Sequence, residues 1–593
     1  PVHLEHAAQL LVERGARVPS RIVVACDADD GGRGAAEVAR VLRGRVAARA
    51  VEAAPGPIAL APARQNERRD DLHPTGAYAM TARHLSKSKI LSGLQCPKRL
   101  YLLCHEPQLA DEPDEQRAAL FAQGHEVGRL AQQVFPSGVL LSEDHLAHRE
   151  AVSHTRELMA DKTIPAIFQG AFSFEDIYVR ADMLVRLPGN RWRLIEVKSS
   201  TGVDAKHIPD VAIQRYVLEG CGYKVADACL MHINKQYEYD GKTHNLATTK
   251  ITKKKEGTKS KTKVARLFSI QSLREEIRQF EKELPALLAG QWKVLASKHA
   301  PDVPCGTHCS SPFGCEFYEY CHEGQTDDWV GNLPGIGKKQ DELIAEGITS
   351  VLKIPGHYPL SGVQKRALDC IRKNRPYYDG NLRTIISKLD YPLYFMDFET
   401  AFPALPRYAG MHPYDQIPFQ WSVHLKPGPR ARLEHYEFLN GDGGDPRRAF
   451  IERLLPVLEE HRQAKIVVYS DFESRCLSLL ANAFPRYAGR IEAVRERLWD
   501  LLKVIRANVY HPRFLGSFSI KNVLPALVPS MSYENMAIAD GLQAGVAYEK
   551  LTGNELGPRE KARLRKALLA YCEQDSLAMV RLLEHLKRSG VME

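Results

Sequence analysis

The sequence has no apolar stretch that approaches about 18 residues, the length a membrane-spanning helix requires. Its first twenty residues carry acids and lack the apolar core of a secretory signal. A P-loop of the form G-x4-G-K-[ST] is missing, and so is any internal repeat. These absences predict a cytoplasmic protein with no membrane partner. They also imply that any ATP-driven unwinding would come from a partner such as a helicase.

Length and composition predict a globular protein of several domains. One domain usually takes about 100–200 residues, and this chain has 593, of which 44% are hydrophobic. The net charge of +9 is mild. It permits a nucleic-acid partner without requiring one.

Residues 1–79 differ from the rest in being rich in Ala and Arg, and Met80 opens a stretch that reads like a natural start. We interpret 1–79 either as a poorly ordered extension or as a stretch that precedes the true start of the protein. Within it, RIVVACDADDGGRGAAEVARVL combines an apolar strand, Asp27 and Asp29, a Gly-rich turn and a helix. This segment resembles the last part of a Toprim domain, in which such acids hold Mg²⁺. A Toprim site also needs an upstream Glu for which there is no room, so we expect no activity from the fragment.

A β-hairpin is predicted where YVRADMLVRL and RWRLIEVKSS flank a Pro-Gly-Asn turn. Asp182 lies on the first strand, and Glu196 and Lys198 share one face of the second. Pairing about the turn brings Asp182 nearly opposite Glu196. Two carboxylates at that separation can hold a divalent cation, and a neighbouring lysine can orient an attacking water. An E-x-K tripeptide alone is more often a charged outer strand face.

Helices are predicted on both sides of this hairpin. The upstream segment FAQGHEVGRLAQQVF carries His125 and Glu126, and the downstream segment DVAIQRYVLEGCGY carries Gln214 and Tyr216. This order resembles the RecB/AddB-type PD-(D/E)XK nucleases over about residues 85–325. The resemblance implies a Mg²⁺ or Mn²⁺ site held by His125, Asp182 and Glu196, and a catalytic set formed by His125, Asp182, Glu196, Lys198 and Gln214. Glu126 is an alternative to His125, and Tyr216 follows Gln214 more closely than the family's Gln-x-x-x-Tyr pattern has it.

The twelve cysteines are unevenly placed, with Cys305, Cys309, Cys315 and Cys321 inside seventeen residues. Cytosolic chains rarely use cysteine for disulfides, so such a cluster indicates a metal. Members of the same nuclease family tie one early and three late cysteines around a [4Fe–4S] cluster. The resemblance implies the ligands Cys96, Cys309, Cys315 and Cys321, with Cys305 as a competitor. Zn²⁺ is the alternative, because four thiolates suit either, and free structural thiols are the third possibility.

Residues 326–385 contain NLPGIGKKQDELIAEGITSVLKI, which predicts a helix, a tight glycine turn and a second helix. The pattern resembles a helix-hairpin-helix DNA-binding motif. It implies phosphate contacts from Gly335, Gly337, Lys338 and Lys339 that read no bases. The alternative is a hairpin that only packs against its neighbours. A Lys-rich stretch at 248–263 is either a solvated loop or a second phosphate-contacting arm.

Residues 386–593 begin with three strand patterns, YPLYFMDF, FQWSVHLK and EHYEFL, followed by a helix and the strand KIVVYS. Asp397 and Glu399 share one face of the first strand, and Tyr571 and Asp575 share one face of a late helix. This arrangement resembles the DEDD exonucleases of the DnaQ type, tyrosine subclass, over about residues 390–590.

The DEDD resemblance implies an RNase H-like fold and two-metal hydrolysis. Asp397, Glu399 and Asp575 would hold the metals, and Tyr571 would position water. Glu473 stands where the family has its middle Asp, with Asp471 and Asp500 as fallbacks. Lys521, in the helical pattern GSFSIKNVLPAL, is a further candidate for substrate contact. An inactive RNase H-like module is the alternative.

The sequence as a whole predicts an α/β multidomain protein. Its parts are the extension 1–79, a PD-(D/E)XK restriction-endonuclease-like domain at 80–325, a small helix-hairpin-helix at 326–385 and an RNase H-like DEDD domain at 386–593. The expected function is a metal-dependent DNA nuclease acting on single strands or ends in repair, recombination or defence, with a 3′–5′ exonuclease head. The alternatives are a nucleic-acid-binding scaffold with one or both heads inactive, and an RNA-processing exonuclease.

Overall fold

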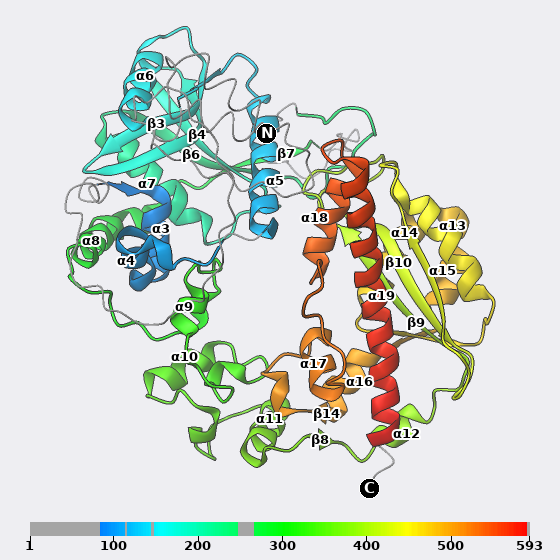
Figure 1. The fold of residues 1–593 in the computed structure, drawn as a ribbon. Coiled ribbons are helices and arrows are strands. Elements are labelled where there is room, and N and C mark those ends of the chain that lie inside the picture. The colour runs from blue at the N-terminus through cyan, green and yellow to red at the C-terminus, as the bar shows by residue number, and fades with distance from the viewer. Residues whose placement is uncertain (1–83, 113–114, 144–146, 247–265, 590–593) are drawn as a thin grey trace, which may run out of the picture. The chain divides into compact units, whose positions relative to one another are not determined.

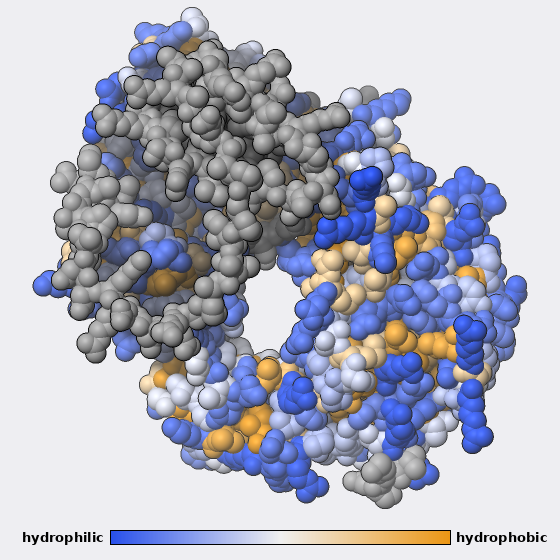
Figure 2. Space-filling view, viewed as in Figure 1, coloured by the Kyte–Doolittle hydropathy of each residue, from blue (hydrophilic) through white to orange (hydrophobic). Residues whose placement is uncertain are grey.

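The computed structural model describes residues 84–112, 115–143, 147–246 and 266–589, which lie in one compact unit (Figure 1). The Toprim-like pair Asp27 and Asp29 and the Lys-rich stretch 248–263 fall outside the described residues. In this part of the chain no helix is both long and apolar enough to cross a membrane. Figure 2 shows a mainly hydrophilic face on which apolar residues form small groups.

The first half of the chain is built on a mixed seven-stranded sheet. Strands β3, β4 and β5 are antiparallel neighbours, β5 and β6 run parallel with helix α7 between them in sequence, and β7 is antiparallel to β6. The strands are β1 (Leu85–Ser86), β2 (Val139–Leu140), β3 (Ala166–Phe174), β4 (Ile177–Leu187), β5 (Arg191–Lys198), β6 (Lys224–Ile233) and β7 (Phe268–Ser272).

The predicted hairpin is confirmed as β4 and β5. Its turn contains Gly189 at φ 75° and Asn190 at φ 52°, a backbone region that glycine and asparagine adopt at low cost. Met183 pairs with Ile195, so the preceding Asp182 lies at the level of Glu196. The turn chemistry therefore sets the register that brings these two acids together.

Helices cover this first sheet. Helix α7 (His207–Gly220) packs on β3, β4 and β6 and against α8 (Ile277–Leu295), and α3 (Lys87–Gln95) contacts α7 and α8. Apolar side chains of α7 such as Ile213 and Val217 are fully buried with Trp192 of β5. Full burial of one such side chain contributes roughly 1.5–3 kcal/mol. The other helices here are α4 (Pro97–His105), η2 (Pro107–Leu109), α5 (Glu115–Gln132) and α6 (His148–Ala160).

The middle segment is helical but differs from the predicted hairpin in its first element. Only a single 3-10 turn, η4 (Val330–Asn332), precedes the glycine turn, and a full helix, α10 (Lys338–Ala345), follows it. Gly331, Pro334 and Gly335 leave no stretch in which a longer helix can form. The remaining elements are η3 (Thr307–Cys309), α9 (Tyr318–His322), η5 (Val351–Lys353), α11 (Gly362–Lys373), β8 (Tyr377–Tyr378) and α12 (Leu382–Ile386).

The second half contains a five-stranded sheet in the order β11-β10-β9-β12-β13. Strands β9, β10 and β11 are antiparallel, while β12 and β13 run parallel to β9. These strands are β9 (Leu393–Ala401), β10 (Ile417–Lys426), β11 (Glu434–Leu439), β12 (Lys465–Val468) and β13 (Leu498–Asp500). The three predicted opening strands are confirmed as β9, β10 and β11.

Helices bury both faces of this sheet (Figure 1). Tyr394, Met396 and Phe398 of β9 pack in one core with α13 (Pro446–Glu459), α14 (Phe472–Ala483) and α15 (Ala488–Arg495). The odd-numbered residues of β9 face α18 (Gly541–Thr552) and α19 (Pro558–Ser589), because strand side chains alternate. The other elements are η6 (Pro485–Tyr487), α16 (Leu501–Asn508), β14 (Val509–Tyr510), η7 (Pro512–Phe514) and α17 (Ile520–Leu527).

One glutamine joins the glycine turn to the next helix. Gln364 completes the capping box of α11 with Ser361. Its Nε2 also donates to the carbonyls of Pro334 and Gly335 at 3.1 and 3.3 Å.

We expect Gln364→Ala to destabilise this segment by about 1–2 kcal/mol, because it removes half a capping box and leaves two carbonyls unpaired. Hydrogen exchange at the amides of α10 and α11 measures the change. Gln279→Ala, in an exposed side chain of α8, is the matched control. Equal exchange in the two variants would contradict the prediction.

Candidate functional sites

The first polar group forms where β4, β5 and α7 meet. The Lys198 Nζ donates to Glu196 Oε1 and to Asp210 Oδ2, both at 2.6 Å. The Gln214 Nε2 donates to Glu196 Oε2 at 2.7 Å and to Asp210 Oδ1 at 3.0 Å. Asp182 accepts the backbone N–H of Val197 at 2.9 Å. Four residues singled out from the sequence, Asp182, Glu196, Lys198 and Gln214, are therefore brought together.

Two members of this group were missed in the sequence. Lys87 of α3 donates its Nζ to Glu196 Oε1 at 3.0 Å and lies 2.8 Å from Asp210 Oδ1. Asp210 lies one helical turn before Gln214, a spacing visible in the sequence. Lys87 is 109 residues from Glu196 and carries no local signal.

The first group is nearly balanced in charge. Burial and the Asp182 charge raise the pKa of Glu196, but Lys198 and Lys87 outweigh them and hold it below its usual value. Burial lowers the pKa of Lys87, while Glu196 and then Asp210 raise it, so that it ends well above its usual value. Three carboxylates against two ammonium groups leave one negative charge, which can attract a cation or let the lysines face a phosphate.

The upstream helix α5 packs on β5, but its two candidate side chains do not join this group. His125 and Glu126 are exposed on α5, and no hydrogen bond between described residues joins His125 to Asp182 or Glu196. The role of His125 stays a prediction. The Tyr216 hydroxyl donates to Glu175 at 2.7 Å, away from the polar group.

The second polar group lies between β9, α14 and α19. Asp397 and Glu399 of β9, with Cys572 of α19, each place a possible ligand atom within 4.8 Å of the others. The Cys572 Sγ donates to Asp397 Oδ2 at 3.4 Å. Asp575 of α19 and Glu473 of α14 raise the pKa of Asp397 through their charges, so all four acids act on one another.

Burial is the largest cause that raises the pKa of these carboxyl groups. For Asp397 the next causes are the charges of Asp575 and Glu399. The pKa values of Asp397 and Glu399 are raised well above their usual range. Burial also raises the pKa of Asp575 to about 6 and that of Glu473 to about 8. At neutral pH, ionising all four requires positive charge among them.

Glu473 occupies the position predicted for the middle acid. It is 3% exposed, and its Oε2 has no hydrogen-bond partner among the described residues. A buried carboxylate oxygen without a partner is unfavourable unless a cation binds it, so the group fits a divalent ion. The fallback acids are engaged elsewhere: Asp500 caps α16, and Asp471 is 63% exposed and pairs with Arg475 at 3.5 Å.

Two side chains partly offset the negative charge. The Tyr533 hydroxyl donates to Asp575 Oδ1. The Lys521 Nζ lies 5.7 Å from the ring centre of Tyr571, and its charge lowers the pKa of Glu399 and Asp575. Tyr571 also lowers the pKa of Asp575. Lys521 was a candidate from the sequence, while Tyr533 carried no signal there.

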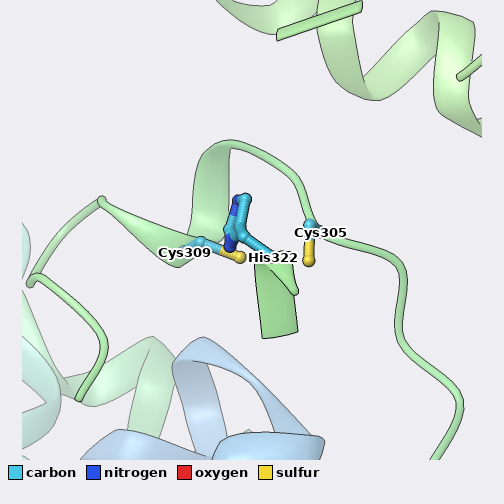
Figure 3. Close-up of side chains that lie close together, drawn as sticks. All are labelled: Cys305, Cys309 and His322. Atoms are coloured by element: carbon cyan, nitrogen blue, oxygen red, sulfur yellow. The ribbon is translucent and has the colours of Figure 1, made fainter. Parts of the chain in front are cut away.

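The cysteines form a third group. One pocket is lined by Cys96, Cys305, Cys309, Cys315 and Cys321. Cys305, Cys309 and His322 place ligand atoms within 4.8 Å of one another (Figure 3). The set predicted from the sequence is thus brought together. It is joined by the expected competitor Cys305 and by His322, which the sequence did not point to.

Protonation in the cysteine group favours metal binding. The pKa of the Cys309 thiol is lowered to about 5, and the largest cause is a hydrogen bond from Cys305. The His322 Nδ1 donates to the Tyr318 carbonyl at 2.8 Å, and its Nε2 is buried without a partner. A thiolate and an imidazole lone pair are both metal ligands. This group can bind a metal.

The glycine turn has the backbone that the sequence predicts. Gly335 and Gly337 adopt φ values of 56° and 53°. An added Cβ would meet nothing within 4 Å at either position, so conformation rather than space requires glycine. Lys338 is exposed at the start of α10, and the Lys339 Nζ donates to the Pro359 carbonyl.

Comparison with known families gives one match. A family described as Domain of unknown function (DUF2779) matches residues 394–519, which cover β9 to α16 and include Asp397, Glu399 and Glu473. No curated protein is significantly similar to the chain.

The second group predicts a pH-dependent stability. Its carboxyl groups hold protons more tightly in the folded protein than in the unfolded chain, where their pKa is about 4. Their contribution to stability is therefore complete below about pH 4 and is lost as the pH rises through about 6 for Asp575 and about 8 for Glu473.

We expect the Tm of chelator-treated protein to fall between about pH 5 and about pH 8, and to fall less in Glu473→Gln. Calorimetry measures both, with Glu584→Gln, further along α19, as the control that keeps the wild-type slope. An identical fall in wild type and Glu473→Gln would contradict the linkage.

Proposed function

We propose that the chain is a metal-dependent nuclease that hydrolyses phosphodiester bonds in DNA. The observation that carries this proposal is the convergence of three buried carboxylates, Glu399, Glu473 and Asp575, with the half-buried Asp397. The pKa values of all four are raised. Such a group is most stable when divalent cations neutralise it. Sites of this kind serve phosphoryl transfer, because cations can then act on both the attacking and the leaving oxygen.

The second half would be a 3′–5′ exonuclease head of the RNase H-like, DEDD kind. Asp397, Glu399, Glu473 and Asp575 would hold Mg²⁺ or Mn²⁺, which activates water and offsets charge on the phosphate. Tyr571, one helical turn before Asp575 on α19, would position the attacking water. Lys521, beside the Tyr571 ring, would approach the phosphate as a cation.

The first half would be a RecB-like head of the PD-(D/E)XK kind. Asp182 and Glu196 would bind a divalent ion, and Lys198 would orient water or stabilise charge on the phosphate. Gln214 holds Glu196 in place at 2.7 Å. Lys87 is expected to be displaced from Glu196 when a cation arrives, because both compete for the same oxygen.

Substrate and pathway follow from the segment between the heads. The backbone amides after Gly337, with the Lys338 side chain, would bind a phosphate at the start of α10. Such contacts read no bases, so we propose action on single strands or ends in DNA repair, recombination or defence. Neither group discriminates against RNA, which keeps RNA processing as an outcome of the test below.

The cysteine group would hold a [4Fe–4S] cluster on Cys96, Cys309, Cys315 and Cys321. All four line one pocket, and thiolates are the ligands of such clusters. Zn²⁺ bound by Cys305, Cys309 and His322 is the second candidate, favoured by the unpartnered His322 Nε2. Either metal would act in folding, since it joins segments far apart in the sequence.

Digestion of end-labelled single-stranded DNA and RNA with Mg²⁺ or Mn²⁺ tests the nuclease proposal. Lys198→Ala and Asp397→Ala should each slow the formation of one set of products by at least about 100-fold, as the loss of one transition-state contact does. The double variant should leave both substrates intact. Lys162→Ala and Asp442→Ala, at exposed positions, are controls. A wild type that binds DNA and never cuts it supports the scaffold instead.

Metal analysis of protein purified without oxygen tests the cysteine group. A [4Fe–4S] cluster predicts iron and sulfide that are lost in Cys96→Ser and Cys315→Ser and retained in Cys370→Ser, a buried cysteine elsewhere. If the protein instead contains zinc that is lost in Cys305→Ser and His322→Gln, the group is a Zn²⁺ site and not a [4Fe–4S] cluster. Protein with neither metal would leave free thiols.

A further inference from the structure

A separate polar group lies beside the carboxylates, on the same face of the second sheet. His424 of β10 pairs with His435 of β11, and their rings stack with centroids 4.5 Å apart. Glu573 of α19 lies above them. These three residues each place a possible ligand atom within 4.8 Å of the others.

One assignment of donors satisfies every hydrogen bond that two serines make with these rings and with each other. The Ser576 hydroxyl donates to the Glu573 carbonyl at 3.1 Å, so its proton is already used. Its 2.6 Å contact with Ser422 therefore has Ser422 as the donor. The Ser422 oxygen must then accept from His435 Nε2 at 2.9 Å, and the Ser576 oxygen must accept from His424 Nδ1 at 2.8 Å.

This arrangement leaves one lone pair on each ring, on Nε2 of His424 and on Nδ1 of His435. Hydrogen bonds of this kind, made by the other ring nitrogen, orient histidines that bind metals. Burial, which is the largest effect, together with the charges of His435 and Arg581, lowers the pKa of His424 to about 3, so it is neutral. The His435 Nδ1 lies 3.8 Å from Glu573 Oε1, too far for a hydrogen bond.

We propose that His424, His435 and Glu573 form a Zn²⁺-binding site. Two neutral imidazoles and one carboxylate are a ligand set that Zn²⁺ accepts. Bonds of about 2.0–2.2 Å place two donors on one ion roughly 3–4 Å apart, which suits the separation of His435 and Glu573. The side chains of Glu573 and His435 are 47% and 23% exposed, so the ion can enter from solvent and keep an open position.

The site would connect to the carboxylate group through the backbone. Ser422 pairs with Asp397 across β10 and β9, and Ser576 follows Asp575 on α19. A Zn²⁺ ion here would tie α19 to β10 and β11 and so restrain Tyr571 and Asp575. The inference does not depend on nuclease activity, because it concerns binding alone.

Zinc content tests the site in the full chain. Protein is equilibrated with Zn²⁺ in excess Mg²⁺, which competes at the carboxylate groups, then passed through a desalting column and analysed by plasma emission spectrometry. We expect Glu573→Gln and His435→Gln to bind one Zn²⁺ fewer per chain than wild type. Glu584→Gln on the same helix and His357→Gln at an exposed position should match wild type.

Thermal stability measured with and without Zn²⁺ distinguishes loss of the site from misfolding of the His435→Gln variant. Zn²⁺ should raise the Tm of wild type by a few degrees, because a ligand that binds only the folded state stabilises it, and the rise should shrink in Glu573→Gln. That substitution keeps the shape of a half-exposed side chain. Equal zinc content and equal Tm shifts in wild type and Glu573→Gln would overturn the proposal.

Discussion

Mutual repulsion among buried carboxylates is the constraint on which the second half of the protein depends. Asp397 and Glu399 lie on the face of β9 that α19 covers, and α19 adds Asp575 to the same space. Four acids in a buried position are unfavourable without positive charge. Tyr533 and Lys521 offset part of this repulsion. The remainder requires protons or cations, so these residues could hold a metal ion.

The first polar group resolves the same problem differently. Lys87 and Lys198 pair with Glu196 and Asp210, so this group is largely neutralised by the chain itself. A cation or a phosphate must displace one of these ion pairs to bind. We therefore expect the two halves to differ in their demand for metal, with the second half the more dependent.

The cysteine group joins distant parts of the chain. Cys96 lies between α3 and α4, and the other cysteines of the pocket follow it by more than 200 residues. Bringing such segments together carries an entropic penalty that grows slowly with loop length. A bound metal offsets this penalty once and then holds α4 near α9. Binding at this site is therefore coupled to folding of the first half.

The sequence by itself determined the local elements and the residues whose spacing is short. The Pro-Gly-Asn turn fixed the hairpin register and hence Asp182 with Glu196, and alternation along β9 fixed Asp397 with Glu399. Tertiary structure alone decided which distant side chains complete each group: Lys87, Tyr533, His322, and Glu573 beside His424 and His435. These contacts arise when elements far apart in the chain pack together, and no short-range periodicity encodes them. For the same reason His125, on a helix predicted correctly, lies exposed and makes no hydrogen bond to the described residues of the group expected around it.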